Sequence, residues 1–236
     1  MKISVLIPVY NEESTVEELI RKVYLIKGKG VISDLEIVAV NDCSTDGTLQ
    51  VLEKMESSGY IKLVSHEKNS GKGAAIRTAI AHATGDVTIF QDADLEYDPE
   101  DIVKMAGVMS EKGLDILYGS RFTGKETSPL GRLHFFVNGG LTTLSNIFTG
   151  LKLTDMETCY KMFKAEVIKK IEIEENRFGL EPEITAKAGR LVESGNLRME
   201  EIPISYNPRR KAQGKKIGIK DGFRAVYIIF KYGFQK

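Results

Sequence analysis

Short apolar runs rich in β-branched residues alternate with longer amphipathic runs through the first half of the chain, and this alternation limits the folds it can adopt. The pattern predicts strands over residues 3–9, 35–40, 61–64, 87–90 and 114–118, and helices over 16–26, 48–55, 74–83 and 102–109. Strand and helix units that repeat every few tens of residues are typical of a doubly wound, mostly parallel sheet with helices on both faces. The predicted fold class is therefore α/β and Rossmann-like, with a first half of nucleotide-binding style.

The alternation weakens after Tyr118. The remaining sequence predicts a loop over 119–133, helices near 137–148 and 184–192, a strand over 197–206 and a terminal helix over 221–232, with a polar and aromatic segment at 154–164. No repeat, low-complexity tract or linker divides the 236 residues. We therefore expect one domain, 1–236, made of two halves, 1–122 and 123–206, followed by a basic loop and amphipathic helix at 207–236.

The composition is that of an ordinary soluble globular protein, with 42% hydrophobic and 28% charged residues. Only two cysteines occur, Cys43 and Cys159, so a disulfide framework is not expected and a reducing compartment is favoured. No apolar run approaches the roughly 18 residues of a membrane-spanning helix. A signal peptide is not expected either, because Asn11 and two acidic residues follow the first apolar run. These features predict a cytoplasmic protein.

A net charge of zero hides a strong asymmetry. Residues 207–236 contain nine Lys or Arg and one acid, which gives this segment a net charge of +8 and the rest of the chain −8. A basic segment on an acidic body suggests contact with an anion such as a membrane surface, a phosphate or a nucleic acid, and a merely solvated tail is the alternative. Residues 223–234 are apolar with interspersed cations, which is compatible with a helix in the membrane interface or with one packed on the body.

Two carboxylates, Asp92 and Asp94, follow the predicted strand 87–90 directly. The carboxyl end of such a strand faces the crevice where open α/β sheets bind ligands. Carboxylate oxygens suit Mg²⁺ or Mn²⁺, and Mg²⁺ commonly completes its coordination with water and substrate phosphates. Glu96 offers a third oxygen. The alternative is an exposed acidic turn before Pro99.

Two further loops should meet the acidic pair, because parallel strands present their carboxyl ends at one edge of a sheet. In these loops, Asp42 is suited to accept hydrogen bonds from a base, Tyr10 offers a flat face for it, and Glu12 can reach a ribose hydroxyl. The alternative is that residues 11–14 and 44–46 only cap helices.

Gly71, Lys72 and Gly73 precede a predicted helix, where free amide groups and a lysine are suited to a phosphate. This sequence matches no established phosphate-binding fingerprint, so the signal is weak by itself. Arg121 follows the fifth predicted strand and should lie near the same crevice, although an ordinary surface arginine is an equal alternative.

Together these segments resemble the ordered motifs of glycosyltransferase family 2, and most of all its branch of dolichol-phosphate mannose synthases and polyprenyl-phosphate glucosyltransferases. The resemblance covers nearly the whole chain. The motifs are 8–12, 41–48, 71–73, 92–96, 119–122, 154–161, 178–183, 206–209 and 214–217. Two positions depart from the family pattern, since relatives often have Gln at the position of Glu96 and Asp at that of Asn41.

The resemblance implies a GT-A fold and an enzyme that moves a hexose, with inversion, from a nucleotide-diphosphate sugar of the GDP-mannose or UDP-glucose type, with Mg²⁺ or Mn²⁺. Carried over by position, the nucleotide-sugar-binding residues are Pro8, Tyr10, Asn11, Glu12, Asp42, Lys72, Gly73, Asp92 and Ala93. The metal ligands are Asp92, Asp94 and Glu96, and the catalytic residues are Asp92, Asp94 and Arg121. The candidates for the acceptor phosphate are Arg121, Arg132, Arg209 and Lys215.

The implied acceptor is a polyprenyl or dolichyl phosphate, which is already ionised and needs guiding cations rather than a general base. Asp155, Glu157, Glu181 and Glu183 are candidates for sugar recognition or for ordering an acceptor loop. The expected partners include a membrane surface at its cytoplasmic face or a membrane protein, but no nucleic acid. A glycan or other non-lipid acceptor remains an alternative, as do a sugar-1-phosphate nucleotidyltransferase, a nucleic-acid binder and an inactive sugar-nucleotide sensor.

Overall fold

The computed structural model describes residues 1–123, 132–195, 197–208 and 219–234, with only the helical backbone for 132–134 and 219–221. Its described strands form one seven-stranded sheet in the order β3-β2-β1-β4-β6-β5-β7. The strands are β1 (Lys2–Val9), β2 (Asp34–Asn41), β3 (Lys62–Ser65), β4 (Val87–Phe90), β5 (Ile116–Ser120), β6 (Lys161–Lys164) and β7 (Met199–Pro203). All neighbours pair in parallel except β6, which is antiparallel to β4 and β5.

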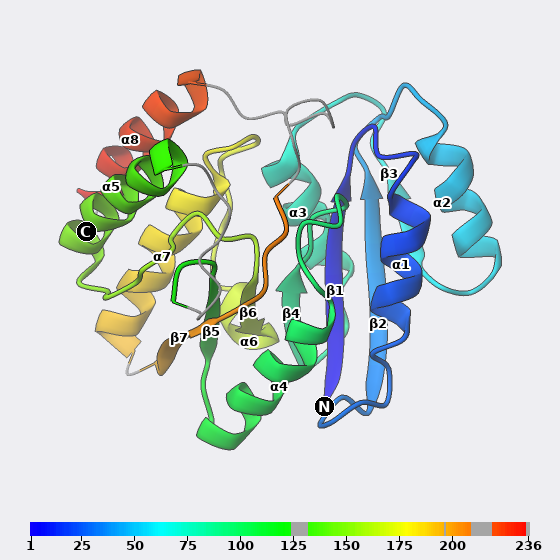
Figure 1. The fold of residues 1–236 in the computed structure, drawn as a ribbon, viewed down its shortest axis with the longest axis horizontal. Helices are drawn as coiled ribbons and strands as arrows, with labels where there is room; N and C mark the ends of the chain where they lie inside the picture. Colours follow the sequence, from blue (N-terminus) through cyan, green and yellow to red (C-terminus); the bar gives the residue numbers. More distant parts are fainter. Residues whose placement is uncertain (124–131, 196, 209–218, 235–236) are drawn as a thin grey trace.

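Helices connect and cover these strands. They are α1 (Val16–Tyr24), α2 (Thr48–Ser57), α3 (Lys72–His82), α4 (Glu100–Lys112), α5 (Arg132–Thr149), α6 (Ala165–Ile168), α7 (Leu180–Gly195) and α8 (Ile219–Gly233). Figure 1 shows α1 and α2 at one end of the sheet and α5, α7 and α8 grouped at the other. These last three helices pack against one another, and α3 packs against β1 and β2.

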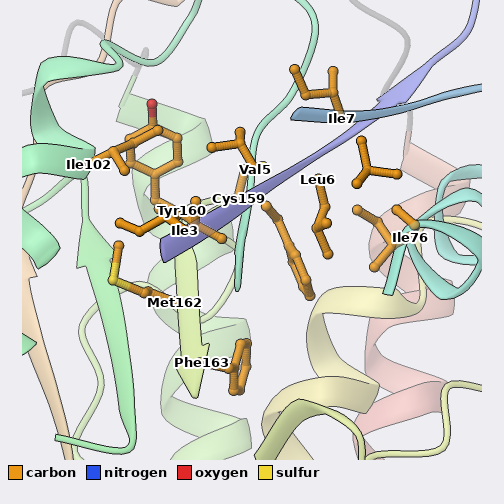
Figure 2. Close-up of a cluster of buried hydrophobic side chains, with 14 of the residues drawn as sticks. Ile3, Val5, Leu6, Ile7, Ile76, Ile102, Cys159, Tyr160, Met162 and Phe163 are labelled. Atoms are coloured by element: carbon orange, nitrogen blue, oxygen red, sulfur yellow. The ribbon is translucent and has the colours of Figure 1, made fainter. Parts of the chain in front are cut away.

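Strand β1 lies near the middle of the sheet, and its side chains are buried on both faces. Ile3, Val5 and Ile7 point to one face and Leu6 to the other, and none of the four is exposed. They join Ile76 and other residues in one hydrophobic cluster (Figure 2). Burial on both faces explains why β1 is a nearly continuous apolar run, and it requires helices on both sides of the sheet. The predicted α/β fold is confirmed.

The structure adds one strand to the sequence prediction. Strand β6 lies within the segment that the sequence marks only as polar and aromatic, and it separates β4 from β5. Its first residue, Lys161, is buried and donates to the carbonyl oxygens of Met156 and Thr158. Because this buried strand begins with a lysine, a prediction based on apolar runs does not find it.

The element boundaries in the second half also shift. Helix α7 begins at Leu180 rather than near residue 184, with Glu181 and Glu183 in a first turn where carboxylates favour the helix dipole. The strand predicted over 197–206 is limited to β7. Of the predicted loop 119–133, the first two residues complete β5, α5 begins at Arg132, and residues 124–131 lie outside the described part.

Phe163 should be a main source of stability where β6 joins the sheet. Its ring is fully buried, with its centroid 5.9 Å from that of Phe90 and 6.0 Å from that of Tyr118. We expect Phe163→Ala to lower the free energy of unfolding by about 3–5 kcal/mol because it leaves a cavity. Chemical denaturation measures the loss. The matched control is Phe223→Ala, at a side chain that is 75% exposed, with an expected change within about 0.5 kcal/mol. Equal losses in both variants would contradict the packing argument.

Candidate active site

The loops that follow β1, β2 and β4 are joined by hydrogen bonds at the carboxyl edge of the sheet. The Asn11 amide donates to Ser44 Oγ at 3.0 Å, and Asn11 Oδ1 accepts from the Thr45 amide at 2.8 Å. Thr15 Oγ1 donates to the carbonyl oxygen of Ala93 at 2.9 Å, which ties the start of α1 to the acidic loop. The predicted convergence of the three loops is therefore confirmed.

Each of these three loops contains a non-glycine residue with positive φ. They are Asn11 (53°), Cys43 (59°) and Leu95 (61°), and no other non-glycine residue of the described chain has this conformation. Such backbone costs of order 1–3 kcal/mol per residue and persists only where surrounding contacts hold it. The strained residues lie where the loops meet, which indicates that this edge of the sheet is a functional site.

Capping accounts for part of these contacts, since Asp46 Oδ1 accepts from the amide of Thr48, the first residue of α2, at 3.0 Å. The N-cap residues of α1 and α2 are Thr15 and Gly47, and neither helix has a side-chain cap bond at that residue. Glu13 Oε2 instead accepts from the Gly47 amide at 3.0 Å, between the two loops. The polar residues of these loops therefore also hydrogen-bond the two loops to each other.

Asp42 organises the approach to α3. Its Oδ1 accepts from the Ser70 amide at 2.8 Å and lies 2.8 Å from Nδ1 of His66, and its Oδ2 accepts from the Gly71 amide at 2.7 Å. The residue is only 3% exposed. Asp42 therefore holds the loop before α3 in place, and its contact with a base stays a prediction.

Lys72, the first residue of α3, carries the charge at the centre of the site. Its Nζ lies 2.8 Å from Asp92 Oδ1 and 2.8 Å from Glu181 Oε1. Burial alone would lower the pKa of Lys72, but the two carboxylates raise it well above the ordinary lysine value. Burial likewise acts against ionised Asp92, yet Lys72, with smaller contributions from Cys159 and Arg121, lowers the pKa of that carboxyl. The Gly71-Lys72-Gly73 segment, which is a weak signal in the sequence, thus provides a lysine that forms an ion pair with Asp92 in the loop after β4.

The acidic loop itself is closely tied to the segment after β7. Asp94 Oδ1 accepts from the Glu96 amide at 3.1 Å, and Glu96 Oε2 accepts from the Tyr206 hydroxyl at 2.6 Å. Across the described residues, no group of three or more His, Cys, Asp or Glu side chains is arranged to hold a metal ion. The role of Glu96 as a third ligand stays a prediction. Asp92 and Asp94 still fit Mg²⁺ or Mn²⁺, since one or two carboxylates suffice when phosphates supply the other oxygens.

Arg121 lies at the end of β5 and is held by Asp155. Its Nε and Nη2 donate to the two carboxylate oxygens at 2.7 and 2.8 Å, and its guanidinium carbon lies 5.1 Å from the centroid of the Tyr206 ring. The surface-arginine alternative is wrong, because the side chain is only 8% exposed. The side chain of Arg132, and Arg209 and Lys215 entirely, lie outside the described residues.

The four acidic candidates of the second half have different environments. Asp155 pairs with Arg121 and Glu181 with Lys72. The oxygens of Glu183 accept from the amides of Glu174 and Glu175, both at 2.8 Å, and Lys187 also contacts it. Glu157 differs from these three, as its buried Oε1 has no hydrogen-bond partner within the described structure. Burial and then the charge of Glu181 raise the pKa of Glu157 to about 7.

Some residues of the site were missed by sequence reasoning. Thr15 joins two loops, and His66 bridges Asp42 and Thr78, with its Nε2 2.9 Å from Thr78 Oγ1. Tyr160 donates to Oε1 of the fully buried Gln91 at 2.6 Å, directly behind the acidic pair. The one available signal was the position of Thr15 at the start of a predicted helix.

The fold and this edge define an α/β protein with a mostly parallel sheet and an acidic pair after a central strand. The sequence model of Glycosyl transferase family 2 matches residues 4–172 of the chain. The chain therefore belongs to glycosyl transferase family 2, and it is a glycosyltransferase. This membership decides against the nucleotidyltransferase alternative.

Curated relatives include lipid-phosphate sugar transferases. The chain is 30% identical over 241 residues to a dolichol-phosphate mannosyltransferase of Pyrococcus furiosus, covering 98% of this chain and 64% of the relative. It is 28% identical over 241 residues to a dodecaprenyl-phosphate galacturonate synthase of Rhizobium johnstonii, covering 99% of this chain and 67% of the relative. The chain thus spans about two thirds of the length of these relatives.

Solved glycosyltransferase structures share the GT-A-like fold. The glucosyl-3-phosphoglycerate synthase of Mycobacterium tuberculosis with UDP has a TM-score of 0.74 at 19% identity, covering 98% of this chain and 80% of that chain. The same synthase has been solved with Mn²⁺ and with Mg²⁺. TarS of S. aureus with UDP-GlcNAc has a TM-score of 0.64 at 23% identity, covering 98% and 66%.

Removal of the Lys72 charge should be visible in the titration of Asp92. We expect the pKa of Asp92, measured by carbon-detected NMR, to be higher in Lys72→Met than in the unaltered protein. A carboxyl with a lowered folded pKa stabilises the fold above its unfolded pKa of about 3.9, and this contribution disappears as pH falls through the lower folded value. Lys72→Met should therefore lose less stability on acidification from about pH 5 to pH 2.

The control for this measurement is Lys22→Met. Lys22 forms an exposed ion pair with Glu18 on α1, with Nζ 2.8 Å from Glu18 Oε1. This variant should leave the titration of Asp92 unchanged. An Asp92 pKa that is the same in Lys72→Met and in the unaltered protein would show that the ion pair does not form in solution.

Proposed function

We propose that this glycosyltransferase moves a hexose, with inversion at the anomeric carbon, from a nucleotide-diphosphate sugar to a polyprenyl or dolichyl phosphate. The observation that carries the proposal is the joining of Lys72 to Asp92 at the edge where the loops after β1, β2 and β4 meet. In this arrangement the Lys72 ammonium, which is suited to bind a phosphate, lies beside the loop of Asp92 and Asp94, whose carboxylates are suited to bind a metal ion. The names of the lipid-phosphate relatives support the class of acceptor.

The nucleoside belongs, in this proposal, between the first two loops. Tyr10, Glu12 and Asp42 would contact the base and ribose, and Lys72 with the first amides of α3 would face the diphosphate. Asp92 and Asp94 would hold Mg²⁺ or Mn²⁺, which supplies positive charge for the leaving diphosphate. Residues 1–122 thus act as the donor-binding half and 123–206 as the acceptor half of a single catalytic domain.

The acceptor phosphate needs no general base, because it is already ionised near neutral pH. One of its oxygens attacks the anomeric carbon while the bond from that carbon to the diphosphate oxygen breaks, and the nucleoside diphosphate leaves. Guiding positive charge is then the main requirement. Arg121, held in orientation by Asp155, is the described candidate, and Arg132, Arg209 and Lys215 remain proposed partners of the phosphate.

The transfer assay uses UDP- and GDP-sugars, Mg²⁺ or Mn²⁺, and a short polyprenyl phosphate. We expect a lipid-linked sugar from at least one pair and a fall in kcat of at least about 100-fold in Asp94→Asn, because the leaving diphosphate loses charge stabilisation. Asp98→Asn is the matched control in the same loop, since the Asp98 carboxylate accepts from the Glu100 amide at the start of α4, at 3.0 Å. Transfer to a glycan but to no polyprenyl phosphate would overturn the lipid assignment, and full activity of Asp94→Asn would overturn the metal role.

Helix α8 has two apolar faces with different surroundings. One face is buried against neighbouring helices, so the alternative that the helix packs on the body holds for this face. That face consists of Ala225, Ile228, Ile229 and Tyr232. The other face has Phe223, Tyr227, Phe230 and Phe234, which are between 40% and 75% exposed. Their spacing places them on one outward stripe of the helix.

Helix α5 packs beside α8 and also exposes apolar side chains, and we call the exposed apolar side chains of the two helices together the α5/α8 face. Its exposed members on α5 are Phe135, Phe136, Val137 and Ile147. The two helices pack side by side (Figure 1), and Phe148 of α5 contacts the rings of Phe230 and Phe234. No helix among the residues of known placement is long and apolar enough to cross a bilayer.

We propose an anionic bilayer surface as the partner of the α5/α8 face. The chain immediately before α8 contains Arg209, Arg210, Lys211, Lys215 and Lys216, so exposed aromatic residues and positive charge adjoin in the sequence. Anionic lipid attracts such cations while the aromatic side chains enter the interface. This placement would bring the site to the membrane that holds a polyprenyl acceptor, consistent with action at its cytoplasmic face.

Flotation with vesicles tests this surface. A Phe223→Ser/Phe234→Ser variant should bind vesicles that contain phosphatidylglycerol at least about tenfold more weakly, because each exposed ring contributes more than about 1 kcal/mol when it leaves water. The control is Tyr24→Ser/Leu25→Ser, which removes exposed apolar side chains from the opposite end of the sheet. Equal binding by both variants would exclude the α5/α8 face as the membrane contact.

A further inference from the structure

The segment between α6 and α7 packs directly against the start of α3. The amide of Ala74 donates to the carbonyl oxygen of Asn176 at 3.2 Å. Arg77 donates through Nη1 to the carbonyl oxygen of Ile173 at 2.8 Å and through Nη2 to Asn176 Oδ1 at 2.9 Å. A Cβ atom on Gly73 would overlap the carbonyl oxygen of Glu175. Only glycine allows the two backbones to approach so closely, next to Lys72.

The side chain of Glu175 reaches from this segment in the other direction, to α8. Its Oε2 accepts from Arg224 Nη2 at 2.6 Å, and its Oε1 accepts from Lys231 Nζ at 3.1 Å and from the Tyr232 hydroxyl at 3.5 Å. Glu175 is only 6% exposed. Burial acts against its charged form, yet hydrogen bonds from Arg224 and Lys231 lower the pKa of Glu175 below its usual range.

A third contact fixes the same segment to α7. Glu183 Oε2 accepts from the Glu175 amide at 2.8 Å. The first turn of α7 also contains Glu181, which holds the ammonium of Lys72. The backbone of Glu175 is therefore bound to the elements that place Lys72, and its side chain is bound to α8. A short chain of contacts through Glu175 therefore links α8 to Lys72 at the centre of the site.

We propose that Glu175 is a positioning residue that couples the seating of α8 to the placement of Lys72 at the donor diphosphate. The proposal rests on the proposed function and extends it, because it links the helix with the α5/α8 face to the affinity for donor. Glu175 does not itself touch the donor. It acts through its backbone contact with Gly73 and through the order it gives to the start of α3.

The coupling has a definite kinetic signature. A Lys72 that is less well positioned weakens ground-state and transition-state contacts with the diphosphate alike, so the KM for the nucleotide sugar should rise while kcat changes little. A residue that only stabilises the fold would lower the melting temperature without this split. Couplings of this kind typically change affinity by about 5- to 150-fold.

The experiment measures nucleotide binding by calorimetry with UDP and GDP in the presence of Mn²⁺, together with KM and kcat. Glu175→Gln and Arg224→Met should each raise the dissociation constant about tenfold. Arg224→Lys keeps the positive charge and should stay within about twofold. Glu18→Gln is the matched control, because it removes a carboxylate from an exposed ion pair on α1. The Arg224 side chain is 51% exposed, so Arg224→Met should fold even where Glu175→Gln does not.

The outcomes separate the two proposals. If the unaltered protein binds neither nucleotide, the proposed function fails. If it binds one, and Arg224→Met binds that nucleotide as tightly as Glu18→Gln does, the coupling is overturned, whatever the change in melting temperature. A raised dissociation constant in Arg224→Met that Arg224→Lys restores, with kcat nearly constant, supports Glu175 as the positioning residue.

Discussion

The ammonium of Lys72 is the charge on which the rest of the site depends. Its side chain is only 17% exposed, and it lies between carboxylates from the loop after β4 and from the first turn of α7. Two carboxylates in such a crevice would oppose each other's ionisation, and a buried lysine without partners would favour its neutral form. The three charges satisfy one another. They also hold together three elements that are far apart in the sequence: β4, α3 and α7.

Hydrogen bonds within and between the loops explain how strained backbone persists at the carboxyl edge of the sheet. Asn11 has a φ of 53°, yet its amide and side chain both bond to the neighbouring loop. Leu95 has a φ of 61° and lies between Asp94 and Glu96, which are joined by a hydrogen bond from amide to carboxylate. Each unfavourable conformation is offset by local bonds that a relaxed loop would lose. The result is a crevice whose shape is set before a ligand arrives.

Much of the first half could be predicted from the sequence because its strands are apolar on both faces and its connections are short. Strand β6 could not, since Lys161 is buried there and its partners are carbonyl oxygens that no sequence pattern reveals. The convergence of loops followed from parallel pairing. The partners of single side chains did not, because the contact between Tyr206 and Glu96 joins residues 110 positions apart. Spacing along the chain carries no information about such a contact.

The acidic residues show why residue type alone does not assign a role. Asp42, Asp155 and Glu183 all fall in motifs that suggest ligand contact, yet their oxygens bind backbone amides, Arg121 or Lys187 within the protein. Glu157 retains a buried oxygen that no described group satisfies, and the pKa of its carboxyl is raised to about 7. Burial thus favours the neutral carboxyl, which can donate a hydrogen bond as well as accept one. Of the four acids of the second half, Glu157 is therefore the one with a buried oxygen that the described protein groups do not satisfy.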